Sequence, residues 1–382
     1  MAVKAALLLA AAAWVCLSAA AASAFDEVPT VAFEERFSPL FGDGNLVRSD
    51  DDRSVRLLLD RRSGSGFISS DYYLHGFFSA SIKLPKDYTA GVVVAFYLSN
   101  GDVYEKTHDE LDFEFLGSRW GGQWRVQTNV YGNGSTSHGR EERYLLPFDP
   151  TLEAHRYSVL WAPTHIMYVL HTFLVLTDRF LLPCTTLITD QSSARVRTCS
   201  FYIDDTPIRE VIRHPEMGGD FPAKPMAVYA TIWDGSTWAT EGGKYKVNYK
   251  YAPFASDFSD LAAVGPRADP VLRVPRSAGG DADLQDLLGL MTADYAVMTP
   301  QKRAAMRAFR ARQMTYTVCY DAVRYASGPF PECDNSDEER DNFSAWGESK
   351  TVVMRPRARG RRRGRKAGAG AVARGRSTVA SS

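Results

Sequence analysis

Three carboxylates, Glu110, Asp112 and Glu114, alternate with large apolar residues in the segment HDELDFEF, residues 108–115. Successive side chains on a β-strand point to opposite faces, so this pattern predicts that the apolar side chains enter a core while the acids form one solvent-facing row. Three acids in one row repel one another, and a fold does not need that arrangement. The row is therefore a candidate catalytic site.

The spacing of the two glutamates suits nucleophilic and acid–base catalysis. Four residues of strand separate their Cα atoms by about 13 Å, at ~3.3 Å per residue. Both side chains can lean inward, toward the separation of about 5 Å that retaining glycoside hydrolysis uses. A hydrogen bond or shared proton from Asp112, between them, would move the two glutamate pKa values apart. Glu110 could then attack an anomeric carbon while a protonated Glu114 donates to the leaving oxygen.

Two other interpretations of the row are a solvated acidic strand and a calcium site. Alternating charges usually mark a solvated face, but three acids backed by three large apolar residues are not expected by chance. Calcium would need further oxygen ligands from a loop, and a flat strand supplies these poorly. His108 could orient a carboxylate or simply cap the row, and the sequence favours neither role.

The elements around the row predict an all-β fold. From Val31 to about Tyr251, short segments of aromatic and β-branched residues alternate with polar ones and are separated by turn residues. So many strands in about 220 residues predict a two-sheet sandwich or jelly roll. The clearest expected strands are residues 77–84, 92–98, 108–116, 124–131, 157–161, 227–233 and 245–249.

The rest of the chain predicts appendages to one domain, residues 25–260. Residues 261–298 have a linker-like composition, and residues 299–354 form a C-terminal extension. Thr299 and Pro300 provide an N-cap and a first helical residue for a helix through Gln313, with Met306 and Phe309 on its apolar side. A strand-like segment, 314–320, follows, and residues 355–382 predict a disordered basic tail.

Composition and charge indicate a secreted globular protein. The 382 residues are 45% hydrophobic and 24% charged, which excludes a wholly disordered, collagen-like or uniformly nucleic-acid-binding chain. The tail holds ten of the 45 Lys and Arg and no acid, so the body is acidic. Residues 1–24 have the charge, apolar run and small-residue end of a signal peptide. The mature chain then holds four cysteines, an even number that suits an oxidising compartment, and a glycosylation acceptor at Asn133.

The segment HDELDFEFLG, residues 108–117, closely resembles the active-site signature of the plant xyloglucan endotransglucosylase/hydrolases, in glycoside hydrolase family 16. The resemblance extends from about Val28 to Asp260 and resumes at residues 316–333. It implies a curved, concanavalin-like β-jelly-roll sandwich with an open cleft, in which Glu110 is the nucleophile, Asp112 its hydrogen-bonding helper and Glu114 the general acid/base. It also implies a disulfide between Cys319 and Cys333.

Further residues are expected to line that cleft. The amides of Gln127 and Asn129 fall on one strand face and could bond sugar hydroxyls, although exposed polar residues are the ordinary alternative. The rings of Trp233 and Trp238 could pack on pyranose faces or simply in the core. The resemblance implies that Arg140 and Arg324 contact substrate, with plain surface charge as the alternative.

Residues 168–200 interrupt the strand pattern with 33 residues that show no alternation. Joining Met167 to Phe201 would restore an uninterrupted strand. An ordinary long loop is the alternative, but structureless loops of this size are uncommon in compact domains. We therefore interpret the segment as an insertion, and as an unspliced segment read in frame rather than a functional loop.

The resemblance implies a secreted enzyme of the plant cell wall, or apoplast, that cleaves the β-1,4-glucan backbone of xyloglucan and transfers it from a donor chain to an acceptor chain. The alternatives are an endohydrolase of xyloglucan or mixed-linkage glucan and a noncatalytic glucan-binding lectin. The basic tail could bind anionic wall polysaccharide such as pectin, or could simply keep the protein soluble. We expect no metal or other cofactor, no nucleic-acid partner and no membrane association.

Overall fold

The computed structural model describes Phe25 and residues 28–135, 139–165, 173–177, 180–184, 196–274, 289, 297–321, 324–325, 330–333, 337 and 340–341. For residues 163–165, 173–177, 180–184 and 196 it describes the backbone alone. The expected signal peptide and the basic tail both lie outside these ranges. No helix among the described residues is long and apolar enough to cross a membrane.

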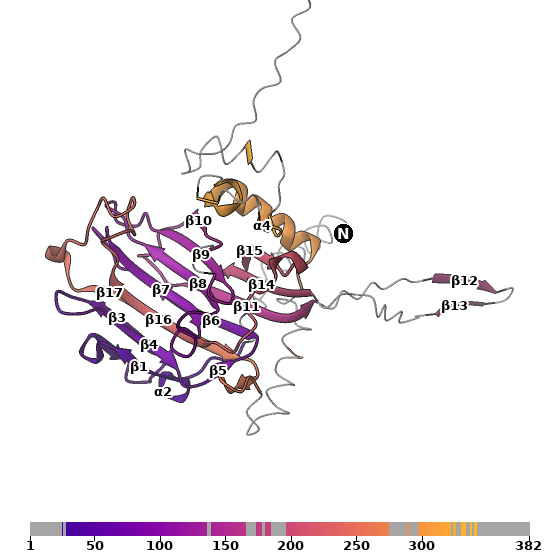
Figure 1. Cartoon of the computed structure of the whole chain (residues 1–382), viewed down its shortest axis with the longest axis horizontal. Helices are drawn as coiled ribbons and strands as arrows, with labels where there is room; N and C mark the ends of the chain where they lie inside the picture. Colours follow the sequence, from indigo (N-terminus) through magenta and orange to yellow (C-terminus); the bar gives the residue numbers. More distant parts are fainter. Residues whose placement is uncertain are drawn as a thin grey trace, which may run out of the picture.

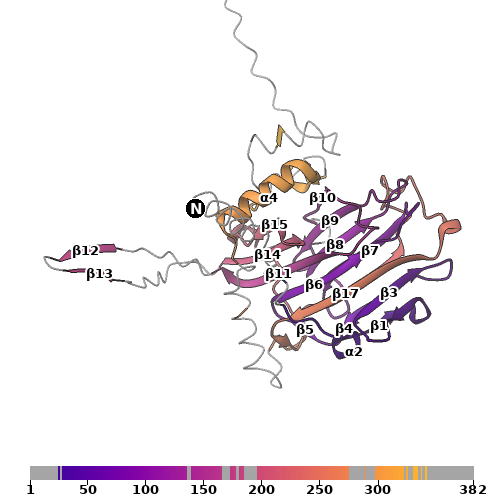
Figure 2. The same cartoon turned by 180° about the vertical axis from the view of Figure 1, so that it is seen from behind.

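Two antiparallel sheets form a β-sandwich, as the sequence pattern predicts (Figures 1 and 2). Within the described residues, one sheet has eight strands and is called here the cleft sheet. Its order is β1 (Phe37–Phe41), β4 (Ser65–Ser69), β16 (Ala227–Asp234), β7 (Val92–Ser99), β8 (Glu110–Leu116), β9 (Arg125–Tyr131), β10 (Glu142–Leu145) and β19 (Met314–Thr317).

The second sheet, called here the back sheet, packs against the inner face of the cleft sheet and has seven strands in the described part of the chain. Its order is β15 (Thr206–Ile212), β14 (Val196–Ile203), β11 (His155–His165), β6 (Gly76–Lys83), β17 (Phe254–Val264), β3 (Ser54–Leu59) and β2 (Leu46–Arg48). One continuous core of buried Phe, Leu, Ile, Val, Tyr and Trp side chains fills the space between the sheets.

Smaller elements connect and flank the sheets. Two further strand pairs are β5 (Tyr72–Tyr73) with β18 (Arg267–Ala268), and β12 (Phe173–Thr177) with β13 (Phe180–Cys184). In the described ranges, the helices are α2 (Phe33–Arg36) and α4 (Pro300–Gln313), and the 3-10 turns are η1 (Asp43–Asn45), η3 (Pro215–Met217), η4 (Tyr249–Tyr251) and η5 (Val318–Tyr320).

The C-terminal extension completes the cleft sheet. The hydroxyl of Thr299 accepts a hydrogen bond from the backbone N–H of Lys302, 3.2 Å away, which confirms the predicted helix start. Phe309 is buried and Met306 half-buried, as expected for the apolar side of α4. The chain then enters β19, which pairs with β10 at the edge of the cleft sheet. The strand is shorter than the predicted 314–320, because the hydroxyl of Thr317 accepts from the backbone N–H of Cys319 and η5 begins there.

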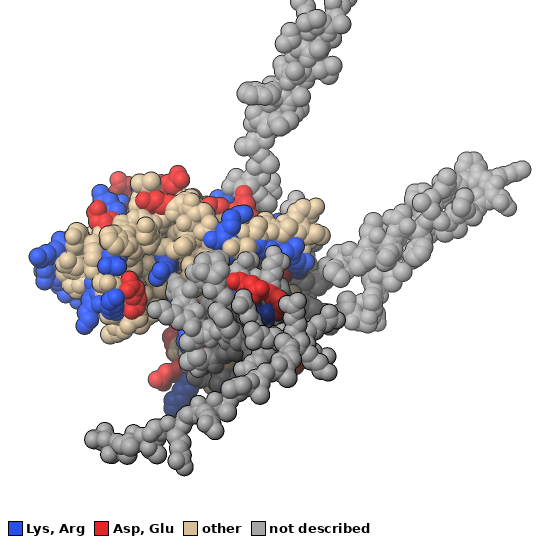
Figure 3. Space-filling view, turned by 90° about the horizontal axis from the view of Figure 1, so that it is seen from above, with Lys and Arg blue, Asp and Glu red and all other residues tan. Residues whose placement is uncertain are grey.

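Glu142 of β10 joins this extension to the sandwich. Its buried carboxylate accepts hydrogen bonds from Arg310 of α4, at 2.6 and 3.0 Å, and from the hydroxyl of Thr317, at 3.1 Å, and Arg209 of β15 lies 3.4 Å away. Burial alone would raise the pKa of Glu142, but the two arginines outweigh it and lower the pKa to about 2. Figure 3 views the side of the molecule on which α4 lies and shows basic and acidic side chains interspersed there.

One predicted strand and the predicted start of the linker are wrong. The strand expected at 245–249 is absent, because Tyr245 makes one bridge to Thr240 and the side chain of Asn248 caps η4 instead. The linker expected from residue 261 does not begin there. The strand β17 continues to Val264, after a bulge at Asp260, and its buried alanines Ala262 and Ala263 pair with β6.

The expected insertion, residues 168–200, leaves the sandwich at the open end of the β11–β14 hairpin. Its last residues, 196–200, belong to β14, so the expected C-terminal limit is corrected: Ser200 pairs with Leu160 and Cys199 with Trp161. β12 and β13 pair only with each other and lie outside the sandwich (Figure 1). The remaining residues of the segment lie outside the described ranges.

Removing residues 168–200 should therefore stabilise the protein. In the shortened chain the residues next to Phe201 become Ile166 and Met167, which would occupy the positions of the buried Cys199 and Ser200 opposite Trp161 and Leu160. Larger apolar burial and a much shorter loop should raise the free energy of unfolding by about 2 kcal/mol or more. Urea denaturation of both chains measures this difference. A shortened chain that is less stable than the full one would show that the segment belongs to the fold.

Candidate active site

Strand β8 positions the acidic row by burying its opposite face. Leu111, Phe113 and Phe115 are fully buried between the sheets. The ring of Phe115 lies 4.6 Å from that of Tyr157, and the ring of Phe113 lies 5.3 Å from that of Phe201 on the back sheet. Since β8 pairs with β7 on one side and β9 on the other, its register is fixed and the three acids must face outward together.

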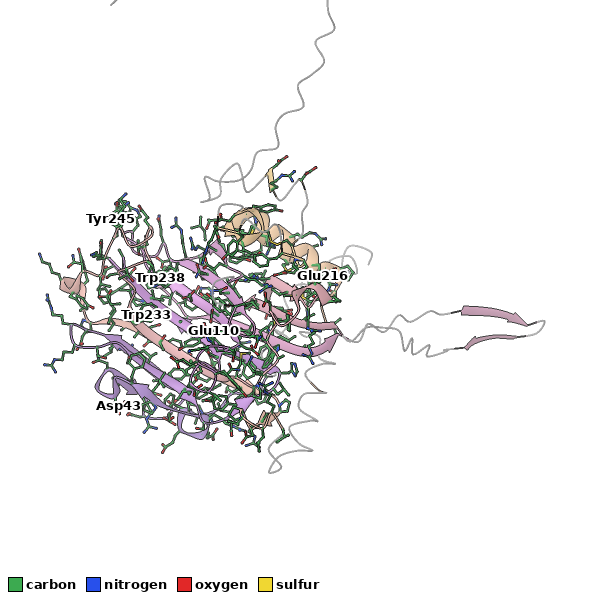
Figure 4. All side chains as sticks on the ribbon, in the orientation of Figure 1. Asp43, Glu110, Glu216, Trp233, Trp238 and Tyr245 are labelled. Carbon is green, nitrogen blue, oxygen red and sulfur yellow. A yellow bond between two sulfur atoms is a disulfide. The ribbon has the colours of Figure 1, made fainter. Side chains whose placement is uncertain are left out.

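The acids open into a cleft of about 540 Å³ on the outer face of the cleft sheet. Neighbouring strands contribute polar and aromatic side chains to its walls. The lining residues are Phe41, Ala95, Tyr97, Glu110, Asp112, Glu114, Gln127, Asn129, Tyr131, Glu141, Thr231, Trp233 and Trp238. Figure 4 shows Glu110 near the middle of the sandwich, with Trp233 and Trp238 on the side toward Tyr245.

Asp112 and Glu110 are hydrogen-bond partners, and their surroundings favour the protonated form more strongly at Asp112. Burial raises the pKa of Asp112 well above its usual range, and the neighbouring charges of Glu110 and Glu114 raise it further. Burial also raises the pKa of Glu110, but hydrogen bonds from Ser99 and Asp112 and the nearby His108 oppose this rise. A protonated Asp112 that donates to an ionised Glu110 is therefore the favoured arrangement.

Glu114 is positioned to be an acid near neutral pH. Burial raises its pKa to about 7, and the charges of Glu141 and Glu110 act in the same direction. A hydrogen bond from the amide of Gln127, with a nitrogen–oxygen distance of 2.5 Å, limits the rise. Glu110 and Glu114 therefore have different partners although they lie on one strand, as division between nucleophile and acid requires.

A chain of three side chains across three strands orients the Glu114 carboxyl group. The guanidinium of Arg143 donates to the amide oxygen of Gln127 at 2.6 Å, which turns the amide nitrogen toward Glu114. The three residues are register partners on β10, β9 and β8. Arg143 also donates to Glu141 at 3.2 Å and lies over the Tyr316 ring. The sequence analysis did not identify Arg143. Only the register between β10, β9 and β8 places it beside Gln127 and Glu114, and that register cannot be read from the sequence.

The other expected cleft residues lie on the strands around the acids or in the loops next to these strands. The side chain of His108 lies 3.9 Å from the Glu110 carboxylate. Asn129 lines the cleft, although its side-chain oxygen accepts from the backbone N–H of Val130 at 2.9 Å. Trp233 and Trp238 are partly buried, with ring centroids 6.0 Å apart. Tyr97, which the sequence analysis did not identify, stacks on Tyr229 and also faces the cleft.

The expectation that Arg140 contacts substrate is corrected by its burial. Only 1% of Arg140 is exposed, and it is not among the cleft residues. Its guanidinium donates to Glu332, lies 3.5 Å from Asp220 and covers the ring of Phe330. Arg140 thus anchors the C-terminal extension, because a sealed guanidinium cannot reach a polysaccharide.

Arg324 lies next to the cleft, because it forms an ion pair with Glu141, which lines the cleft. Its guanidinium lies 2.6 Å from the carboxylate of Glu141, which lines the cleft, and its side chain is 44% exposed. The Cys319–Cys333 disulfide is present, with a Cα–Cα distance of 5.6 Å, and closes the loop that carries Arg324. Asn133 is exposed in a turn, where its backbone N–H donates to Asp109 at 2.6 Å.

Among the residues that the structure describes, no group of three or more His, Cys, Asp and Glu side chains is arranged to hold a metal ion. Within the cleft, Glu110 has Asp112 as a hydrogen-bond partner and Glu114 accepts from the amide of Gln127.

Replacing Gln127 with Leu should raise the pKa of Glu114 above its value of about 7, because the carboxylate loses the donor that stabilises its charged form. Titration of ¹³C-labelled glutamate carboxyl groups by NMR measures this pKa without any substrate. A Gln123→Leu variant is the matched control, since Gln123 is exposed and lies outside the cleft. A Glu114 pKa that falls or stays constant in the Gln127 variant would contradict the assignment.

Two family models match the chain. The model of "Glycosyl hydrolases family 16" matches residues 33–177 and 195–251, and that of "Xyloglucan endo-transglycosylase (XET) C-terminus" matches residues 289–333. The first match is interrupted between residues 177 and 195, within the expected insertion.

Two proteins of Arabidopsis thaliana are similar over most of their length. The chain is 53% identical to "Probable xyloglucan endotransglucosylase/hydrolase protein 30" over 349 residues, which cover 91% of this chain and 90% of that protein. It is also 53% identical to "Probable xyloglucan endotransglucosylase/hydrolase protein 27", over 79% of each chain. Among solved structures, a β-1,3-1,4-glucanase from a mouse hindgut metagenome is 19% identical, with a TM-score of 0.42, and the alignment covers 63% of this chain and 98% of that one. The chain therefore belongs to the xyloglucan endotransglucosylase/hydrolases of glycoside hydrolase family 16.

Proposed function

We propose that the protein is a xyloglucan endotransglucosylase that acts by retaining double displacement. The ionised Glu110 attacks the anomeric carbon of a backbone glucose, while Glu114 donates its proton to the departing glycosidic oxygen. The ester between Glu110 and the donor fragment is then attacked by an acceptor hydroxyl. Glu114 removes the proton of that hydroxyl, and Glu110 leaves as a carboxylate, so that the anomeric configuration is retained.

The observation that carries this proposal is the division of protons along β8. A hydrogen bond from Asp112 opposes the rise that burial causes in the pKa of Glu110 and so favours its ionised form, while burial raises the pKa of Glu114 to about 7, where it can both give and accept a proton. A binding protein has no use for such a division. This favours an enzyme over the lectin alternative.

Membership of the family and the walls of the cleft support xyloglucan as the substrate. The similar Arabidopsis proteins carry xyloglucan in their names. The cleft is open and combines indole rings with amide and carboxylate groups, which suits the apolar faces and hydroxyl edges of a glucan chain.

The C-terminal extension supports transfer over hydrolysis. It adds β19 to the cleft sheet and brings Tyr316 and Arg324 next to Arg143 and Glu141, beyond the acid/base. A wall at this position provides contacts for an acceptor chain, which must compete with water for the ester on Glu110. The alternative is hydrolysis of xyloglucan, and its rate must be measured beside the rate of transfer.

Incubating the protein with xyloglucan and labelled xyloglucan oligosaccharides tests the proposal. We expect label to enter the polymer faster than new reducing ends appear, and Glu110→Gln should abolish both activities while it retains polymer binding. Reducing ends without label incorporation would identify a hydrolase. Normal turnover by Glu110→Gln would overturn the assignment of the nucleophile, and polymer binding without any turnover by the unmodified protein would identify a lectin.

We also propose that the protein is secreted to the cell wall and that its basic tail, residues 355–382, binds anionic polysaccharide there. Ten cations should give weak binding that salt screens. Wall-bound protein should therefore elute at lower salt when the tail is deleted. Identical elution of both chains would indicate a tail without this partner.

A further inference from the structure

Trp120 is a large apolar side chain that remains in solvent, with 61% of its surface exposed. It lies in the loop that connects the end of β8 to β9, six residues after Glu114. Single exposed apolar residues are common and need no function. Trp120 differs because neighbouring side chains hold its position and because it lines two adjacent hollows of the surface.

Arg119 connects Trp120 to the rim of the cleft. Its guanidinium lies over the Trp120 ring, 5.0 Å from the centroid, and over the ring of Tyr245, at 4.0 Å. It also lies 3.5 Å from the carboxylate of Glu241. These contacts limit the motion of the Trp120 ring while most of the residue stays exposed, which lowers the entropic cost of binding on it.

Two hollows meet at Trp120. One, of about 160 Å³, lies between the loop after β8 and the segment 239–241. The other, of about 710 Å³, continues past Gln123 to residues 145–149. Trp120, Gln123 and Leu145 line both. Polar groups thus accompany an exposed ring along a continuous path, which is the combination that a pyranose with one apolar face requires.

The direction of the proposed reaction places this path on the acceptor side. Glu110 binds the anomeric carbon, whereas Glu114 protonates the oxygen of the departing sugar, so the departing and the accepting chains lie toward Glu114. The same direction along β8 leads to Leu116, which packs with Trp233 and Trp238 of the cleft. Figure 4 shows these two tryptophans between Glu110 and Tyr245, whose ring contacts Arg119.

We propose that Trp120 forms a distal subsite for the acceptor glucan, beyond the cleft and continuous with it through Trp238, Tyr245 and Arg119. This inference rests on the proposed function, because the assignment of the two glutamates sets the direction. The occupant is the far end of a long acceptor chain, and an acceptor with a short backbone does not reach it.

The test measures binding in a Glu110→Gln background, where no turnover consumes the ligand. Isothermal titration calorimetry would compare xyloglucan oligosaccharides with short and long backbones. Trp120→Ala should raise the Kd of long oligosaccharides by about 3- to 10-fold, the range for loss of an aromatic contact. The Kd of short ones should not change, and Trp120→Tyr should restore binding of the long ones. In the active enzyme, Trp120→Ala should raise KM for long acceptors and leave kcat unchanged.

Val47→Ala is the control, because Val47 is also a half-exposed apolar residue and lies on β2, at the edge of the back sheet. Equal affinity of Trp120→Ala and the parent for long chains would overturn the subsite, as would equal weakening of short and long chains or absence of all oligosaccharide binding. A length-dependent loss in Trp120→Ala, together with an inactive unmodified protein, would support the subsite and overturn the proposed catalysis.

Discussion

The hydrogen bond from Asp112 to Glu110 depends on the straight, doubly paired backbone of β8. Alternate side chains must leave opposite faces of such a strand, so burying Phe113 and Phe115 on one side forces the acids together on the other. The free energy gained from the buried aromatic face offsets the repulsion and desolvation of the row. The close arrangement of the three acids is thus a consequence of packing, since without the buried core face the row could spread apart.

The cleft sheet also depends on the buried carboxylate of Glu142, on the strand next to its β19 edge. Glu142 lies one residue before Arg143, which orients Gln127, and its carboxylate holds both α4 and β19. The same short strand, β10, therefore supports Glu114 from its outer face and the C-terminal extension through its inner one. A buried acid among arginines contributes fixed geometry more than net stability, because the desolvation cost consumes much of the attraction.

Much of this architecture could be predicted from the sequence, because local patterns carry it. The alternation of residues 110–115 predicted the strand and its buried face, and the pair Thr299 and Pro300 predicted the start of α4. Features that depend on contacts between distant segments could not be predicted. Burial of Arg140 under Phe330 and the register that aligns Arg143 with Gln127 are both of this kind. The end of β17 was missed because its alanines lack a strong strand preference.

Strand β19 can join the cleft sheet only late in biosynthesis. It is the last strand of the cleft sheet in chain order and covers the free edge of β10. Until Met314–Thr317 have left the ribosome, the main chain of β10 presents unpaired amide and carbonyl groups to other nascent polypeptides. Completion of the sandwich therefore waits for translation of the C-terminal segment, and the disulfide between Cys319 and Cys333 then secures an edge that had been open until that moment.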